Sequence, residues 1–196
     1  MPYYPSCLVP DVNLGPNCEP ELGRVRAVAF VHRNYFNTII SDVTNLTNWD
    51  IGRSANRIYV YPETQGEFNG GDPINVRGFG SVEEFPLLYN FQLKISEPNY
   101  KGNRDHWNAL IGNRNYHVFW QTETIMYAST RPVVIVPKNP QSNSLKDEVV
   151  WVAEIQWTDN KFPFEYDRDN NVMSWSYTFV PPPYYSFDDS FDNSYQ

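Results

Sequence analysis

The sequence lacks a long apolar run, since no hydrophobic stretch approaches the roughly 20 residues that a membrane-spanning helix requires. Its first ten residues, MPYYPSCLVP, lack the basic start and apolar centre of a signal peptide. Cations are few, because 15 Lys and Arg stand against 23 Asp and Glu, which gives a formal charge of −8. We therefore expect a soluble cytosolic product that binds no membrane and makes no direct contact with nucleic acid.

Cysteine is scarce as well. Cys7 and Cys18 lie in a proline-rich stretch, and the nearest histidine along the chain is His32. A zinc site needs about four ligands, so these residues predict no metal site. We expect two reduced thiols, and a disulfide formed after release from the cell is the alternative.

Catalytic signatures are mostly missing. The sequence has no GxSxG, no phosphate-binding Walker loop, no HExxH and no CxxC, and the glycines of GFGS at 78–81 indicate a turn. The histidines His32, His106 and His117 are isolated from one another in the sequence. We therefore expect no catalytic residue, no cofactor and no enzymatic activity.

One acidic segment partly matches the pattern of a calcium-binding loop. DRDNN at 167–171 places oxygen ligands at alternating positions, as such a loop does. However, Val172 stands where a calcium loop has glycine, and Thr178 stands where it has glutamate. The segment indicates a turn between two strands.

Aromatic side chains and proline are abundant, with 14 Tyr, 12 Phe, 6 Trp and 16 Pro, while charged residues make up only 19%. The centres of protein interfaces favour Tyr, Trp and Phe over Lys, Glu and Asp. Strands also use aromatic residues heavily. The composition thus fits a β-rich protein with extensive interfaces.

Strand signals recur along the middle of the chain. The clearest is LLYNFQLKI at 87–95, where apolar and polar residues alternate as in a half-buried antiparallel strand. GEFNGGDP at 66–73 indicates a long turn. The remaining predicted strands lie at 24–32, 57–61, 74–80, 116–123, 133–136, 148–157 and 172–180.

Two segments predict helices. RDHWNALIG at 104–112 has Asn103 or Asp105 as its cap and Gly112 as its stop. Residues 35–50 show a weaker helical spacing, with Asn34 as the cap. We therefore predict a mainly β fold, all-β or α+β: a β-sandwich or barrel-like single domain with one or two short helices.

Two extended arms flank this predicted core domain of residues 24–180. The N-terminal arm covers residues 1–23, and the C-terminal arm covers 181–196, PPPYYSFDDSFDNSYQ, whose aspartates have no Lys or Arg beside them. Such a segment cannot fold on itself, so we expect a neighbouring chain to order it. The predicted partner-binding residues are the aromatic anchors and the aspartates that would meet Lys or Arg of the partner, namely Tyr184, Tyr185, Phe187, Phe191, Asp188, Asp189 and Asp192.

Three stretches carry a resemblance to a known group of proteins. DHWNALIGNRNYHVFWQTET at 105–124, VVIVPKNP at 133–140 and EVVWVAEIQWTDNKFPFEYD at 148–167 resemble small virion proteins of tailed phages that infect Bacteroides and relatives, including crAss-like phages. The paired-cysteine arm followed by ELGRVRAVAF is similar too. The matching positions are packing and turn residues: Trp107, Asn108, Leu110, Phe119, Trp120, Pro137, Lys138, Pro140, Glu148, Val149, Trp151 and Trp157.

This resemblance implies a non-enzymatic structural protein of the virion, assembled in the host cytoplasm. The expected role is a ring, neck or tail component that forms homo-oligomeric rings in the portal–tail assembly, with the portal and neighbouring ring or tail proteins as further partners. The alternative is a capsid-decorating protein or a carbohydrate-binding adhesin. An adhesin should expose two or three tryptophans as a platform, whereas a ring subunit should bury most of them: Trp49, Trp107, Trp120, Trp151, Trp157 and Trp175.

Overall fold

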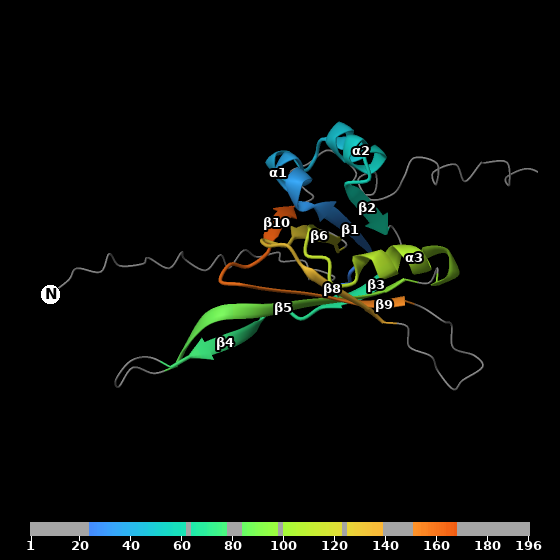
Figure 1. Ribbon diagram of the computed structural model, residues 1–196. Helices are drawn as coiled ribbons and strands as arrows, with labels where there is room; N and C mark the ends of the chain where they lie inside the picture. The colour runs from blue at the N-terminus through green and yellow to red at the C-terminus, as the bar shows by residue number, and fades with distance from the viewer. Residues whose placement is uncertain are drawn as a thin grey trace, which may run out of the picture.

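The computed structural model describes residues 24–61, 64–77, 84–97, 100–122, 125–138 and 151–167 (Figure 1). Its helices are α1 (Arg33–Ser41), α2 (Leu46–Ser54) and α3 (Tyr100–Leu110). Its strands are β1 (Ala27–His32), β2 (Ile58–Tyr61), β3 (Gln65–Phe68), β4 (Asp72–Val76), β5 (Phe85–Glu97), β6 (Tyr116–Gln121), β7 (Ile125–Ala128), β8 (Val134–Lys138), β9 (Trp151–Asp159) and β10 (Phe164–Asp167). The predicted mainly β fold is confirmed.

The strands form two antiparallel sheets. The first has the order β10-β7-β6-β1-β2, and the second has the order β3-β5-β9-β8, with β4 paired to β5 as well. Neither sheet closes on itself within the described residues, so the arrangement is a sandwich rather than a barrel.

The first sheet is the middle of three layers, as Figure 1 shows with α1 and α2 on one side and the second sheet on the other. Strand β1 accounts for this position, because its side chains alternate between two cores. Val28 and Phe30 point into the core between the sheets, whereas Ala29 and Val31 point into the core beneath α1 and α2. A strand that is buried on both faces needs an unbroken apolar sequence, which AVAFV supplies.

The second sheet has one buried and one solvated face. In β5, Phe91, Leu93 and Ile95 are fully buried, while Gln92 and Lys94 lie on the other face. The neighbouring strand β9 has the same alternation. The predicted pattern at 87–95 is therefore confirmed.

Helix α3 covers the edge of the sandwich beside β8 and β2. Trp107 is fully buried there and stacks on Tyr61 with ring centroids 5.1 Å apart. Gly112 follows the helix with a φ of +67°, a left-handed conformation that suits glycine and ends the helix as predicted. The predicted caps are wrong, since Asn103 and Asp105 lie inside a helix that already begins at Tyr100.

The segment predicted as one helix at 35–50 forms two. Asp42 interrupts it, because its carboxylate accepts hydrogen bonds from the backbone and the hydroxyl of Thr44, at 3.2 and 2.7 Å. Asn45 then caps α2. The cap of α1 is His32 rather than Asn34, since His32 Nδ1 accepts a hydrogen bond from the Asn34 N–H at 3.3 Å. The fold thus has three helices instead of one or two.

Three short strands were not predicted, namely β3, β7 and β10. The turn predicted at 66–73 is wrong. The segment contains most of β3 and the start of β4, which both pair antiparallel with β5, so the chain continues in the same direction through an irregularity at residues 69–71. Residues 78–81, 148–150 and 172–180 lie outside the described residues, so the expectations for them stay predictions.

Candidate interaction surface

A two-stranded arm projects from the second sheet (Figure 1). It exists because β5 is longer than its neighbour: β9 pairs with β5 only from Tyr89 to Glu97, whereas β4 pairs with it from Phe85 to Asn90. Residues 85–88 therefore have β4 as their only strand partner in the described part of the chain. We call β4 together with residues 85–90 of β5 the arm.

The base of the arm is fixed by Asn69. Its side-chain amide donates hydrogen bonds to the Asp72 carboxylate at 2.9 Å and to the Asn90 carbonyl at 3.1 Å. Its side-chain oxygen accepts one from the Gln92 N–H at 2.8 Å. The next two residues, Gly70 and Gly71, have φ values of +75° and +98°, which accommodate a bulge between β3 and β4 without reversing the chain. The direction of the arm is thus set by side-chain hydrogen bonds and by two glycines.

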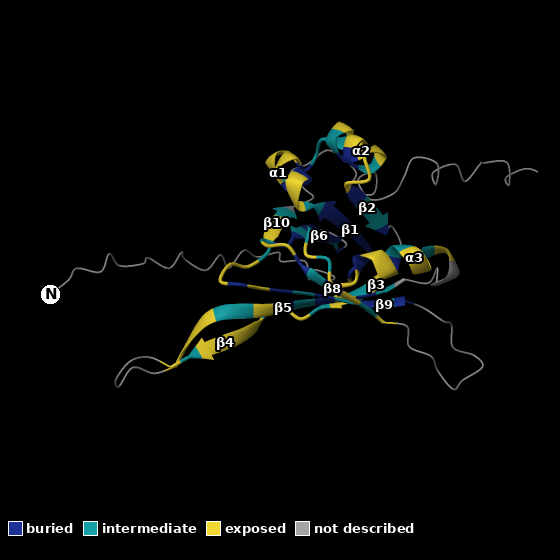
Figure 2. Cartoon of the chain, viewed as in Figure 1, coloured by how far each residue is buried: buried dark blue, intermediate teal, exposed yellow. Residues whose placement is uncertain are grey.

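The arm carries apolar side chains in solvent. Ile74, Phe85 and Leu87 are 41%, 46% and 50% exposed. Ile74 lies opposite Leu88 and Val76 opposite Phe85, so these four side chains share one face, and the register shift in between leaves Leu87 as the extra residue. Figure 2 shows the arm as an exposed and half-buried extension of a buried body. No charged side chain interrupts this face between Ile74 and Val76 or between Phe85 and Leu88.

Exposed aromatic surface continues at the base of the arm. Phe162, in the connection from β9 to β10, is 56% exposed and packs on Tyr89 with ring centroids 4.9 Å apart. The Phe162 ring also packs on Phe91, with ring centroids 5.8 Å apart. Because Leu88 and Tyr89 are adjacent in β5, their side chains point to opposite faces of the strand. Phe162 therefore lies on the opposite face from Leu88 and Ile74, so both faces of this region expose apolar side chains.

Two of the three histidines take part in one aromatic cluster beneath α3. His106 packs on Tyr59 with centroids 4.7 Å apart and forms a hydrogen bond with the Tyr61 hydroxyl. His32 packs on Tyr116 at 5.4 Å. Burial, together with the neighbouring Tyr59, raises the pKa of Tyr116, so its hydroxyl stays protonated at neutral pH. These contacts attach α3 to the edge of the first sheet.

His117 lies apart from that cluster, on the opposite face of the same sheet. Its ring stacks on Phe36 with centroids 3.6 Å apart, and its Nδ1–H donates a hydrogen bond to the Ser129 carbonyl at 3.1 Å. Burial lowers its pKa, although the hydrogen bond to Ser129 acts in the other direction. His117 is therefore neutral at pH 7 and serves the packing of α1 on the sheet.

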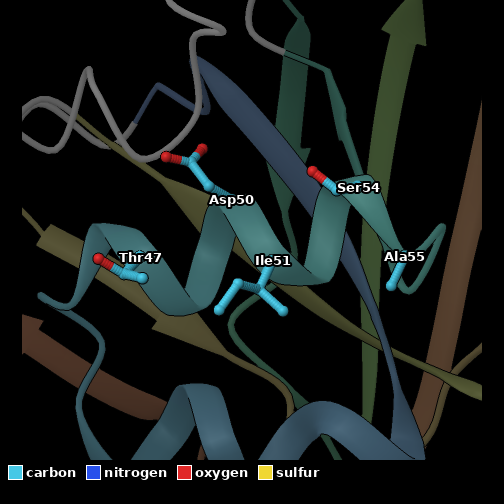
Figure 3. A pocket seen from close by; sticks show the side chains of 5 residues that line it. All are labelled: Thr47, Asp50, Ile51, Ser54 and Ala55. Atoms are coloured by element: carbon cyan, nitrogen blue, oxygen red, sulfur yellow. The ribbon is translucent and has the colours of Figure 1, made fainter.

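A hollow of about 490 Å³ lies along α2 (Figure 3). Its lining residues all come from this helix and its C-terminal cap: Thr47, Asp50, Ile51, Ser54 and Ala55. Ile51 is 54% exposed there. Among the described residues that line it, Asp50 offers one carboxylate, and none offers an imidazole or a cation with which that carboxylate could share a proton. These five residues therefore contain no recognisable catalytic pair.

All the predicted partner-binding residues from Tyr184 to Asp192 lie outside the described part of the chain. The same holds for Cys7 and Cys18, so the expected reduced thiols stay a prediction. Among the residues that the structure describes, no group of three His, Cys, Asp or Glu could hold a metal ion. In the same residues, no helix is long and apolar enough to cross a membrane.

The tryptophans belong to the core. The five that the structure describes, Trp49, Trp107, Trp120, Trp151 and Trp157, are at most 6% exposed. Trp175 lies outside the described residues. None of these five tryptophans is therefore available as a platform for stacking on a sugar ring.

The arm was missed by sequence reasoning, although a signal was present. The segments INV at 74–76 and FPLL at 85–88 are short and mostly apolar, as the two strands of a hairpin are. Pro73 lies in β4, and Pro86 lies in the part of β5 that pairs with β4 but not with β9, which suits residues that cannot donate a ladder hydrogen bond.

The chain was compared with protein-family models, with curated proteins and with solved structures, and none of them matches it.

Proposed function

We propose that this protein is a non-enzymatic structural subunit that assembles with copies of itself, as a ring, neck or tail component of a virion of the kind that its motifs resemble. The observation that carries the proposal is the arm, with Ile74, Phe85 and Leu87 about half exposed on a projecting hairpin. The resemblance supplies the virion context, and the arm supplies the means of assembly.

The arm is an unfavourable feature for an isolated molecule. A two-stranded hairpin is marginally stable in water unless its apolar face packs on something else. Covering three half-exposed side chains would contribute roughly 0.8–1.5 kcal/mol each, which is half of the value for full burial. The total, roughly 2.4–4.5 kcal/mol, reaches only the lower end of the entropic cost of association, about 4–15 kcal/mol, so one arm contact alone is too weak for a stable complex.

A closed ring removes this difficulty. Each subunit would give one arm contact and receive another, and the last contact to form would be intramolecular, which adds affinity without new surface. The middle layer is packed on both faces within the chain, whereas the arm and Phe162 at its base expose apolar side chains that a neighbouring subunit could cover. The buried tryptophans favour this role over the adhesin alternative.

The test is the oligomeric state of the full chain by sedimentation and native mass spectrometry over a range of concentrations. We expect concentration-dependent oligomers that the double substitution Phe85→Ser and Leu87→Ser weakens. The matched control is Ile111→Ser, which removes an exposed apolar side chain after α3, away from the arm. A wild-type chain that stays monomeric throughout, or an arm variant that assembles normally, would contradict the proposal.

The virion part is tested separately. Quantitative mass spectrometry of purified particles should detect the protein at many copies per particle. Absence from the particles would contradict any virion role, whereas presence in the particles together with binding to a glycan array would favour the adhesin alternative.

A further inference from the structure

Three arginines lie together at one end of the first sheet. Arg33 directly follows β1, Arg57 directly precedes β2, and Arg114 lies two residues before β6. These strands are neighbours in the order β6-β1-β2. The backbone confirms their closeness, because His32 N–H donates to the Arg57 carbonyl at 2.8 Å and Arg33 N–H donates to the Asn115 carbonyl at 2.7 Å. Adjacent strands are about 4.8 Å apart, so the three residues span roughly two strand spacings. We call them the arginine cluster.

The arginine cluster is exposed, and none of its members forms an ion pair within the described part of the chain. Arg53 and Arg131 differ in this respect, since they pair with Asp50 and Asp159. The Arg57 guanidinium lies 5.5 Å from the centre of the Tyr35 ring, a cation–π arrangement that leaves its hydrogen-bond donors available to a ligand. In a chain with a net charge of −8, this is a local concentration of uncompensated positive charge.

Aromatic side chains flank the cluster. His32 precedes Arg33, and its half-buried ring packs on Tyr116. Tyr59 is also half-buried, two residues after Arg57, and its ring lies 5.8 Å from that of Tyr116. A ligand that suits this end of the sheet is therefore both anionic and aromatic, because carboxylates pair with guanidinium groups and rings pack on rings.

We propose that the arginine cluster is the docking site for residues 181–196 of a second copy of this chain. This inference rests on the proposed function and identifies one of the contacts between subunits. The segment 181–196 carries Asp188, Asp189 and Asp192, five aromatic residues and no Lys or Arg. Two copies that are each strongly negative repel one another over most of their surfaces. The acidic segment of one copy therefore binds another copy only where that copy presents positive charge that is not already paired. Because every copy has both the segment and the cluster, the contact repeats from subunit to subunit.

Charge reversal in the full chain tests the pairing. The cluster variant carries Arg33→Glu, Arg57→Glu and Arg114→Glu, and the segment variant carries Asp188→Arg, Asp189→Arg and Asp192→Arg. In either variant the two surfaces have the same sign, so we expect self-association to weaken about tenfold or more. An equimolar mixture brings opposite signs together again, so association between differently labelled variants should recover. Recovery would also show that both variants are folded.

The control carries Arg24→Glu, Lys94→Glu and Lys161→Glu, which change the net charge equally at exposed positions elsewhere. We expect it to associate more strongly than the cluster variant does. If the wild type associates and the cluster variant associates equally well, this inference is wrong while the proposed function stands. If both variants fail and their mixture does not recover, docking between copies is also overturned. A wild-type protein that does not associate at all would contradict the proposed function itself.

Discussion

Asp159 shows how a buried carboxylate is used in this fold. Its side chain is 5% exposed and accepts hydrogen bonds from the Thr130 hydroxyl at 2.5 Å and from the Asn160 N–H at 2.7 Å, while the Arg131 guanidinium lies 3.2 Å away. Burial by itself would raise the pKa of Asp159, but these three partners together outweigh burial and lower it. The carboxylate thus connects the loop between β7 and β8 to the end of β9.

We expect Asp159→Asn to lower the free energy of unfolding by about 1–3 kcal/mol at pH 7, because it weakens hydrogen bonds to a buried charged group. The pKa of Asp159 is lower in the folded than in the unfolded chain, so its stabilising contribution is present above about pH 4 and is lost as the pH falls through the folded pKa. Urea unfolding at several pH values measures both effects. A difference between variant and wild type that stays constant down to pH 2 would contradict this assignment.

His117 gives a second pH dependence of the same sign. Burial lowers its pKa in the folded chain, so the unfolded chain binds the proton first, and stability falls as the pH drops below about 6.5. We expect His117→Gln to reduce the loss of melting temperature between pH 7 and pH 5. Measuring both proteins at pH 8, where the imidazole is neutral in either state, isolates the effect of the lost packing on Phe36. Equal pH dependence of the two proteins would show that His117 does not titrate on unfolding.

At the scale of the elements, the sequence predicted those strands whose residues show a regular pattern. β5 alternates cleanly, and β1 and β6 are apolar or aromatic throughout. β3 has the sequence QGEF, which neither alternates nor favours a strand, and it is held by pairing with β5 across Gly66 and Ile95. β7 and β10 are four residues each and pair with one another. Strands this short are determined by their partners, which a local pattern cannot show.

The same contrast between local pattern and strand pairing decides which parts of the interaction surface the sequence could predict. The apolar residues of the arm are local and visible in the sequence, but the length by which β5 exceeds β9 follows only from the pairing of the two strands. The arginine cluster could not be predicted, since Arg33, Arg57 and Arg114 are far apart in the sequence and are brought together by the β1–β2 and β1–β6 pairings.

Helix α2 approaches β2 and α1 most closely at Gly52, in addition to the packing of Trp49 on Phe119. A Cβ atom at Gly52 would lie 2.4 Å from Ile58 Cδ1 and 2.7 Å from a ring carbon of Tyr35. We expect Gly52→Ala to destabilise the fold by about 1–3 kcal/mol through overpacking, although alanine favours an isolated helix by about 1 kcal/mol over glycine. Ser54→Ala, on the exposed side of the same helix, is the matched control and should change stability little. Thermal unfolding followed by circular dichroism gives both values, and a stabilised Gly52→Ala protein would show that α2 can move away from the sheet.

At the scale of the whole molecule, two cores support one sheet from both sides. The core between the sheets contains four of the tryptophans, and the core beneath the helices contains Trp49. Because the first sheet takes part in both, loss of either core removes support from the other, so we expect one cooperative unfolding transition for this body. The arm and the arginine cluster lie at its surface, which leaves them open to change without loss of the fold.

The independence of the folded body from the segment 181–196 is itself testable. The described residues of both cores lie between Val25 and Tyr166, and we expect truncation after Pro183 to leave the melting temperature of the isolated subunit unchanged. Truncation should weaken association, because it removes Asp188, Asp189 and Asp192 together with most of the aromatic anchors. The loss should be largest at low salt, since the screening length falls from about 10 Å at 0.1 M to about 3 Å at 1 M, and at high salt the two chains should differ less. Sedimentation at both salt concentrations measures this difference. A truncated subunit that unfolds on its own would show that the segment packs on its own domain, and an equal difference at both salt concentrations would show that its aspartates do not carry the contact.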